Sequence, residues 1–279
     1  MWRLEKSDIA AQSLTIRRNC VGHIDSWLLD GYDEAVSGEV VNSASEVAVL
    51  GTILGVWAHP DDEAYLSGGL MAMARDQGAR VVCVTATRGE LGTPDRLTWP
   101  PDRLAAERTG ELARCLEILG VTEHHWLGYA DGACSEVPAA EAVEKLRGLI
   151  EEVAPDTVLS FGPDGITGHP DHQAVSAWTA AAFDLAALPH ARLLQAAIAE
   201  RREARWGELN ASLGIYLPGY PVLAAAERLA VDLVLDSETT ARKVRALTAQ
   251  ATQTTGLIAA MGLDRYAAWV SEESFVEPV

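Results

Sequence analysis

Two loops of this chain share the tripeptide His-Pro-Asp and carry side chains that could bind a metal ion. The first loop has the sequence HPDDE at residues 59–63, and the second has the sequence HPDH at residues 169–172. Two histidines and a carboxylate suit a borderline divalent metal, and three protein ligands plus a water define a catalytic rather than a structural zinc site. We therefore predict that His59, Asp62 and His172 are metal ligands.

Asp61 stands beside the predicted ligands without being one of them. A metal lowers the pKa of its bound water toward about 7, and a nearby carboxylate can then take the proton as hydroxide attacks a carbonyl. Asp61 is thus the predicted general base of a hydrolase. In a simpler interpretation, Asp62 and Glu63 only cap the helix that follows. The second loop disfavours that interpretation without excluding it.

The elements that would position these loops alternate between strand and helix. Apolar runs at 53–58, 80–86, 125–127 and 157–161 predict four strands, and the stretches between them repeat apolar residues at helical spacing. This alternation predicts an α/β fold, a Rossmann-like doubly wound, mostly parallel sheet with helices on both faces. In the strand order 3-2-1-4, strands 1 and 4 are neighbours, so the two loops should meet at the crevice between their carboxyl ends.

The two ends of the chain are less regular. Residues 191–209 have the charged, amphipathic pattern typical of a helix, residues 231–235 predict a strand, and Asp236 or Ser237 should cap a further helix. Residues 1–48 show no sustained periodicity and no motif. We assign them to an N-terminal extension of unknown role and residues 49–279 to one domain.

Composition limits the partners of this protein. Its 22 Lys and Arg against 40 Asp and Glu give a net charge of −18, which argues against binding to nucleic acid or to an anionic membrane surface. We find no apolar run of the roughly 18 residues that a membrane span needs, and no signal peptide. The four cysteines form no Cys-x-x-Cys pair and are predicted to be reduced thiols. We expect a cytoplasmic protein with a small-molecule substrate, and the sequence leaves a homo-oligomer open.

The paired loops resemble the LmbE-like, or PIG-L, family of zinc-dependent N-acetylglucosamine deacetylases. The resemblance rests on AHPDDE at 58–63 together with GHPDHQAV at 168–175, and it extends over roughly residues 52–188. It implies that residues 49–279 form an LmbE-like deacetylase domain. It also implies that the metal is Zn²⁺, held by His59, Asp62 and His172, and that Asp61 is the acid/base.

The resemblance implies roles for four further residues. His169, as an imidazolium, would stabilise the oxyanion or protonate the leaving amine, and Asp171 would orient it and raise its pKa. Arg88 and Asp131, in the loops after the second and third strands, would contact substrate hydroxyls. From the residues alone, Arg88 could equally pair with Glu90, and Asp131 could equally be a turn residue.

Three other positions bear on specificity and stability. Arg108 and Glu111 match a helix pattern of the family, yet at a spacing of three residues they are most simply a solvated pair. Thr167 stands where some sugar deacetylases of the family have a tyrosine two residues before the histidine of the second loop. This difference leaves the identity of the substrate open.

The predicted activity is metal-dependent removal of an acetyl, or another acyl, group from an N-acetylated amino sugar or its conjugate. Fe²⁺ remains an alternative cofactor, because a site of two histidines and one aspartate accepts either metal. Two other functions stay open. One is a non-haem iron oxygenase with a His/Asp facial triad, although such sites usually occur in all-β folds. The other is a non-catalytic module that binds sugar or metal.

Overall fold

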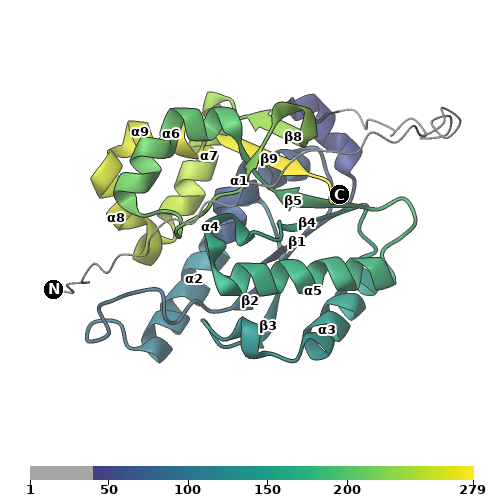
Figure 1. The fold of residues 1–279 in the computed structure, drawn as a ribbon, viewed down its shortest axis with the longest axis horizontal. Helices are drawn as coiled ribbons and strands as arrows, with labels where there is room; N and C mark the ends of the chain where they lie inside the picture. The colour runs from purple at the N-terminus through teal and green to yellow at the C-terminus, as the bar shows by residue number, and fades with distance from the viewer. Residues whose placement is uncertain (1–39) are drawn as a thin grey trace, which may run out of the picture. The chain divides into compact units, whose positions relative to one another are not determined.

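The computed structural model describes residues 40–279, so most of the predicted extension at 1–48 lies outside the described residues. The described chain is built on a seven-stranded sheet with the order β3-β2-β1-β4-β5-β9-β8 (Figure 1). These strands are β1 (Ile53–Trp57), β2 (Val81–Thr87), β3 (Glu123–Tyr129), β4 (Thr157–Phe161), β5 (Arg192–Ala196), β8 (Leu229–Val234) and β9 (Glu272–Val276). The first five run parallel, whereas β9 is antiparallel to both β5 and β8. The predicted mostly parallel α/β sheet is confirmed.

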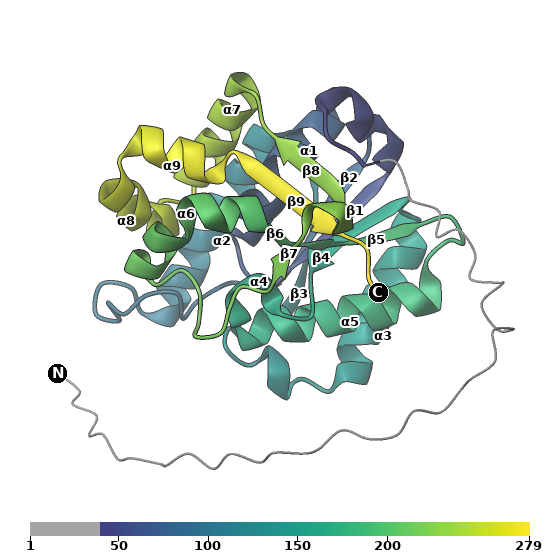
Figure 2. The same cartoon turned by 45° about the horizontal axis from the view of Figure 1, so that its top comes forward.

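The helices lie in two layers around this sheet (Figures 1 and 2). They are α1 (Asp62–Asp76), α2 (Pro101–Leu119), α3 (Ala139–Val153), α4 (Gly165–Gly168), α5 (Pro170–Ala186), α6 (Glu200–Leu213), α7 (Ser237–Thr248), α8 (Ala251–Met261) and α9 (Leu263–Val270). Helices α1, α2 and α7 pack together, and α3 packs on α5. Among residues 40–279, no helix combines the length and the apolar character that crossing a membrane requires.

The central strands are buried along their whole length. Every residue of β1, β2 and β4 is buried, as expected for parallel strands that are covered on both faces. Gly55 pairs with Cys83 of β2 on one side and with Leu159 of β4 on the other. The loops that follow β1 and β4 therefore start side by side at the same edge of the sheet.

The region predicted as one helix at 191–209 is divided differently, and that prediction is wrong in its first half. Residues 192–196 form β5, which pairs with β4 from Thr157↔Arg192 to Phe161↔Ala196. A second small sheet follows, made of β6 (Ile198–Ala199) and β7 (Leu223–Ala224). Helix α6 begins only at Glu200. Sheet pairing outweighs the local helical pattern because Leu193 and Leu194 are buried there.

The structure confirms the predicted helix cap near residue 236 and describes the last residues of the proposed extension. Asp236 Oδ1 accepts a hydrogen bond from Thr239 N at 2.7 Å. Val41 forms a backbone bridge beside β8, accepting from Asp232 N at 2.8 Å and donating to Ala230 O at 3.0 Å. Residues 44–50 form a 3₁₀ helix, η1. The division of the chain into an extension of unknown role at 1–48 and one domain at 49–279 stays a prediction.

Candidate metal centre and active site

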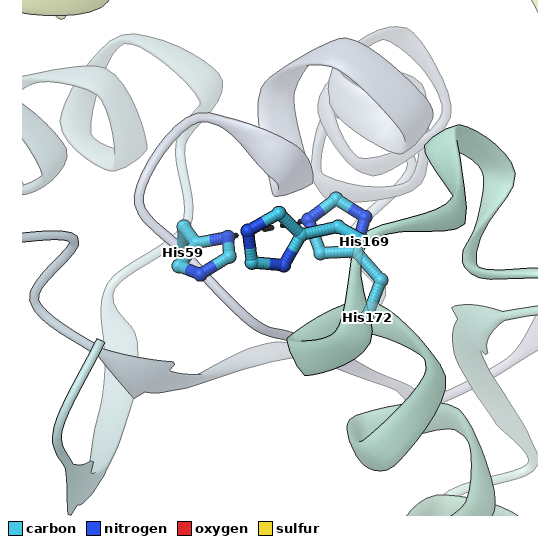
Figure 3. A group of neighbouring side chains, drawn as sticks. All are labelled: His59, His169 and His172. Atoms are coloured by element: carbon cyan, nitrogen blue, oxygen red, sulfur yellow. Dashed lines mark hydrogen bonds between the residues drawn. The ribbon is translucent and has the colours of Figure 1, made fainter. Parts of the chain in front are cut away.

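The two His-Pro-Asp loops meet at the carboxyl ends of β1 and β4. His59 follows β1 and His172 lies in the first turn of α5, and their Nδ1 and Nε2 atoms are 3.2 Å apart. Figure 3 shows these imidazoles together with that of His169. The histidines of the two loops are 113 residues apart in sequence. Their contact therefore follows from the strand order, as predicted.

The three predicted ligands lie close together, but the groups of donor atoms that could share one metal ion are His59, His169 and His172, and His59, Asp131 and Asp171, rather than the predicted set with Asp62. Besides the 3.2 Å between the two imidazoles, Asp62 Oδ2 is 3.6 Å from His59 Nδ1, and Asp62 Oδ1 is 3.4 Å from His172 Nε2. Ligands about 2.0–2.2 Å from a tetrahedral zinc ion lie about 3.3–3.6 Å from one another. The histidine group therefore fits a divalent metal, and the Asp62 carboxylate lies beside it, facing each of the two imidazoles with a different oxygen.

Hydrogen bonds fix which nitrogen each imidazole offers. His172 Nδ1 donates to Gly165 O at 2.9 Å, which leaves the Nε2 lone pair free. His59 Nε2 lies 3.1 Å from Asp131 Oδ1 and 3.2 Å from Asp171 Oδ2. Because carboxylates only accept, His59 carries its proton on Nε2 and presents Nδ1 to the same point.

The surrounding charge favours a cation at this point. Burial alone would lower the pKa of His59, but hydrogen bonds to Asp131 and Asp171 and the charge of Asp62 raise it to about 10. Burial lowers the pKa of His172 to about 4, so this side chain is neutral at pH 7 and has a lone pair that could bind a metal. A metal ion can take the place of the second proton, on His59 Nδ1, which faces Asp62.

Asp61 is held beside the ligands in an unusual backbone conformation. Its φ of +103° is rare for a residue with a side chain. Asp61 N donates to Glu63 Oε2 at 2.9 Å, and Asp61 O accepts from Tyr65 N at 2.9 Å. Its Oδ2 lies 3.3 Å from Arg108 Nη2. Burial raises the pKa of Asp61 to about 8, against the opposing charge of Arg108.

The predicted pairing of the Asp171 carboxylate with His169 is wrong. Asp171 Oδ2 accepts a hydrogen bond from Gly132 N at 2.7 Å, and Oδ1 accepts one from Cys134 N at 3.0 Å. These bonds to the connection between β3 and α3 hold the carboxylate so that Oδ2 faces His59. His169 Nδ1 instead accepts from the backbone N–H of Asp171 at 3.2 Å. Burial, followed by the charge of His59, lowers the pKa of His169; the charge of Asp171 raises it, as predicted, but has a smaller effect. The expected imidazolium is therefore corrected to a neutral imidazole with its proton on Nε2.

Arg88 does not fit the predicted contact to substrate. Its Nη1 donates to Thr109 Oγ1 at 2.7 Å and its guanidinium lies over the Trp126 ring, 4.4 Å from the centroid. The alternative pairing with Glu90 does not occur either, because among residues 40–279 no ion pair joins the two side chains. Glu90 Oε1 accepts from Asp131 N at 2.9 Å, and its buried Oε2 has no partner there. Asp131, in contrast, lines the cavity described below.

Arg108 and Glu111 are buried rather than solvated, so that interpretation is wrong. Their exposed fractions are 3% and 2%. Arg108 donates to Pro60 O in the first loop as well as contacting Asp61. The spacing of apolar residues around Arg108 does indicate that this side chain is buried. Arg108 lies four residues after Leu104 and four before Leu112, on the buried face of α2.

A cavity of about 610 Å³ opens over these groups. Its polar part includes His59, Asp61, Asp62, His169 and His172. A second part, which the sequence did not indicate, is lined by side chains of the last third of the chain, among them Arg202, Tyr216 and Trp269. The cavity can hold a molecule larger than a single acetyl group beside the candidate metal centre.

Comparisons with known proteins agree with this geometry. Residues 54–183 match the profile of the family described as PIG-L, GlcNAc-PI de-N-acetylase. A Corynebacterium glutamicum protein named 1D-myo-inositol 2-acetamido-2-deoxy-alpha-D-glucopyranoside deacetylase is 35% identical over 224 residues, which are 72% of this chain and 74% of that protein. The chain belongs to the PIG-L family. Another PIG-L relative with the same name, from Kineococcus radiotolerans, is 38% identical over 163 residues, which are 48% of this chain and only 45% of that protein.

Several solved structures of similar fold are deacetylases by name, and one, GalB from Pseudomonas putida, is a 4-carboxy-2-hydroxymuconate hydratase with a TM-score of 0.54 and 16% identity, covering 82% of this chain and 96% of its own. The N,N'-diacetylchitobiose deacetylase from Pyrococcus horikoshii has a TM-score of 0.54 and 22% identity, covering 80% of this chain and 82% of its own. The A40926 pseudoaglycone deacetylase Dbv21 has a TM-score of 0.59 and 19% identity, covering 82% and 97%. At these identities the likeness concerns the fold, which this PIG-L chain shares with them.

Thr167 of this PIG-L chain anchors a neighbouring loop to the site. Its carbonyl oxygen accepts from Leu217 N at 2.9 Å, and its Oγ1 lies 3.4 Å from His172 Nδ1. Gln173 Nε2 donates to the Tyr220 hydroxyl at 3.0 Å. The segment from Gly214 to Tyr220 is thereby fixed to the second His-Pro-Asp loop, and it brings Tyr216 to the cavity wall.

Proposed function

We propose that this protein is a metal-dependent deacetylase that hydrolyses the N-acetyl group of an amino-sugar conjugate. The observation that carries the proposal is the spacing of His59, Asp62 and His172 in a cavity that also contains the Asp61 carboxylate. The family supports the substrate class, since the Corynebacterium relative is named as a deacetylase of a 2-acetamido-2-deoxy-glucopyranoside.

In this proposal, His59, Asp62 and His172 hold the metal, with zinc favoured and ferrous iron as the alternative. Such an ion supplies a Lewis acid for the acetyl oxygen and lowers the pKa of water at the site. Asp131 and Asp171 hold the His59 proton on Nε2, which keeps Nδ1 available.

The remaining residues move or stabilise charge during the reaction. In its ionised form, which predominates above its pKa of about 8, Asp61 takes a proton from the attacking water as the water oxygen bonds to the acetyl carbon. His169 donates a hydrogen bond from Nε2 to the oxygen on which negative charge develops. When the carbon–nitrogen bond breaks, the proton held by Asp61 passes to the leaving amine, and the acetic acid that remains releases its own proton to the solvent as acetate. Arg108 keeps the Asp61 carboxylate in place.

The test measures free amine released from N-acetylglucosamine conjugates. Activity should disappear after dialysis against a chelator and return when zinc or ferrous iron is added. His172→Ala should lose both bound metal and activity. His190→Ala is the matched control, because this histidine is exposed and pairs with Asp156 at the surface. Undiminished turnover by protein shown to be free of metal would contradict the proposal.

The two other functions make different predictions. An oxygenase would need molecular oxygen for turnover, and the similarity to named deacetylases disfavours it. A non-catalytic binding module would release no amine from any N-acetylated sugar, while still binding it.

A further inference from the structure

Three arginines on α6, Arg201, Arg202 and Arg205, differ in whether a carboxylate lies near the guanidinium. Arg201 Nε and Arg205 Nη1 lie 3.4 and 3.6 Å from the two carboxylate oxygens of Glu272. Within residues 40–279, no carboxylate lies within salt-bridge distance of Arg202, which donates one hydrogen bond, from Nη2 to Trp269 O at 3.3 Å. An arginine without a carboxylate partner is unexpected in a chain whose net charge is −18.

The Arg202 guanidinium is also incompletely hydrogen-bonded. Its Nε is buried and has no partner in the described part of the chain. Leaving a buried N–H of a charged group unsatisfied costs free energy. Arg202 lines the same cavity as the candidate metal centre, and within residues 40–279 its Nη1 donates no hydrogen bond, so a bound molecule can supply an acceptor to the outer edge of the guanidinium.

Two aromatic side chains complete this part of the cavity. The Trp269 indole is fixed by a hydrogen bond from Nε1 to Asn210 Oδ1 at 2.9 Å, and the Arg202 guanidinium carbon lies 5.6 Å from the centroid of its ring. Tyr216 lines the cavity from the loop anchored by Thr167. Burial raises the pKa of Tyr216, and the positive charge of Arg202 opposes this shift, as expected for close neighbours.

We propose that Arg202 binds an anionic group, a carboxylate or a phosphate, on the amino-sugar conjugate that this enzyme deacetylates. The inference rests on the proposed function. An arginine presents a planar fork of N–H donors that matches both anions, and charge-assisted hydrogen bonds to it are the strong ones. The compound in the names of the Corynebacterium and Kineococcus relatives, a glucosaminide of inositol, carries no charge. The proposed substrate therefore differs from theirs in charge.

The test compares neutral and anionic substrates of similar size. Methyl N-acetylglucosaminide is the neutral probe, N-acetylglucosamine 1-phosphate and 6-phosphate are the phosphate probes, and N-acetylmuramic acid is the carboxylate probe. The wild-type enzyme should show a higher kcat/KM for at least one anionic probe than for the neutral one. Arg202→Gln should lower that value about ten- to a hundredfold, mainly through KM, and change the neutral probe less than about twofold.

Arg205→Gln is the matched control, because this arginine lies on the same helix and is paired with Glu272. It should leave the ratio of anionic to neutral kcat/KM unchanged. A wild-type enzyme that favours the neutral probe would overturn the inference. Equal losses on neutral and anionic probes in Arg202→Gln would overturn it as well, since a merely structural arginine would act in that way.

Calorimetric binding of the same probes separates this inference from the proposed function. If the protein deacetylates none of them, Arg202-dependent binding of an anionic probe, weakened by added salt, would still support the anion site. If it deacetylates all of them and Arg202→Gln binds each as tightly as the wild type does, the deacetylase proposal stands and the anion site is refuted.

Discussion

Asp61 combines a strained backbone with a position next to the predicted metal ligands. A φ of +103° in a residue with a side chain costs on the order of 1–3 kcal/mol. Hydrogen bonds to Glu63 and Tyr65 and the contact with Arg108 hold it there. Strain of this kind is retained where it positions a reacting group, so the conformation itself favours a catalytic role for the carboxylate.

Asp61→Asn should therefore abolish catalysis without emptying the metal site. Asparagine has nearly the same size and also tolerates positive φ better than most residues, but it cannot take a proton. We expect kcat to fall about 10²-fold or more, with unchanged metal content by elemental analysis. Asp102→Asn, at an exposed position in the first turn of α2, is the control. Activity within a few-fold of wild type in Asp61→Asn would rule out a general base at this position.

The motifs predicted which residues meet, but not where every side chain points. His59, Asp62 and His172 converge because the strand order places their loops together. Arg88 and Asp171 were assigned the wrong contacts because tertiary partners decide their direction. The guanidinium of Arg88 lies over the ring of Trp126 on β3, and no local pattern around residue 88 indicates that contact.

Among the elements, the buried central strands were the most predictable. The apolar run at 157–161 coincides with β4, and the run at 53–58 ends one residue beyond β1. These strands are apolar on both faces and therefore stand out in the sequence. The strand at 272–276 and the start of α6 were not predicted. In these segments pairing with a distant strand decides the structure, and β9 pairs with β5 and β8.

A buried ion pair joins three of these elements. Lys243 on α7 and Glu273 on β9 are both fully buried, and Lys243 Nζ lies 2.7 Å from Glu273 Oε1. The two oxygens of Glu273 also accept hydrogen bonds from Gly69 N and Leu70 N of α1, each at 2.7 Å. Burial lowers the pKa of Lys243, and the Glu273 carboxylate opposes that shift.

Lys243→Met should destabilise the protein by about 3–5 kcal/mol, because it leaves the Glu273 carboxylate buried without its countercharge. The free energy of unfolding in urea measures this loss. Lys145→Met is the matched control, since Lys145 pairs with Glu141 on the exposed face of α3, and it should cost less than about 1 kcal/mol. Equal effects of the two substitutions would show that the buried pair contributes no more than a surface pair.

Across the whole molecule, the candidate site draws on distant parts of the chain. The first loop follows β1, the second precedes α5, and the far wall of the cavity comes from α6 and α9. The family profile matches residues 54–183, so Arg202 and Trp269 lie outside the matched segment. The segment that matches the family profile therefore contains the candidate metal ligands, and side chains outside that segment complete the cavity wall.

Because the predicted ligands are 113 residues apart, only the folded chain can bring them to one metal ion. Zinc should therefore stabilise the folded state selectively, by about 2.7 kcal/mol at a free concentration one hundred times its Kd. For a domain of this size, that corresponds to a rise in Tm of about 5–10 °C over the metal-free protein. Thermal melting with buffered zinc measures the shift. His190→Ala should retain it, while His172→Ala should lose most of it. A shift of equal size in both variants would mean that zinc binds elsewhere.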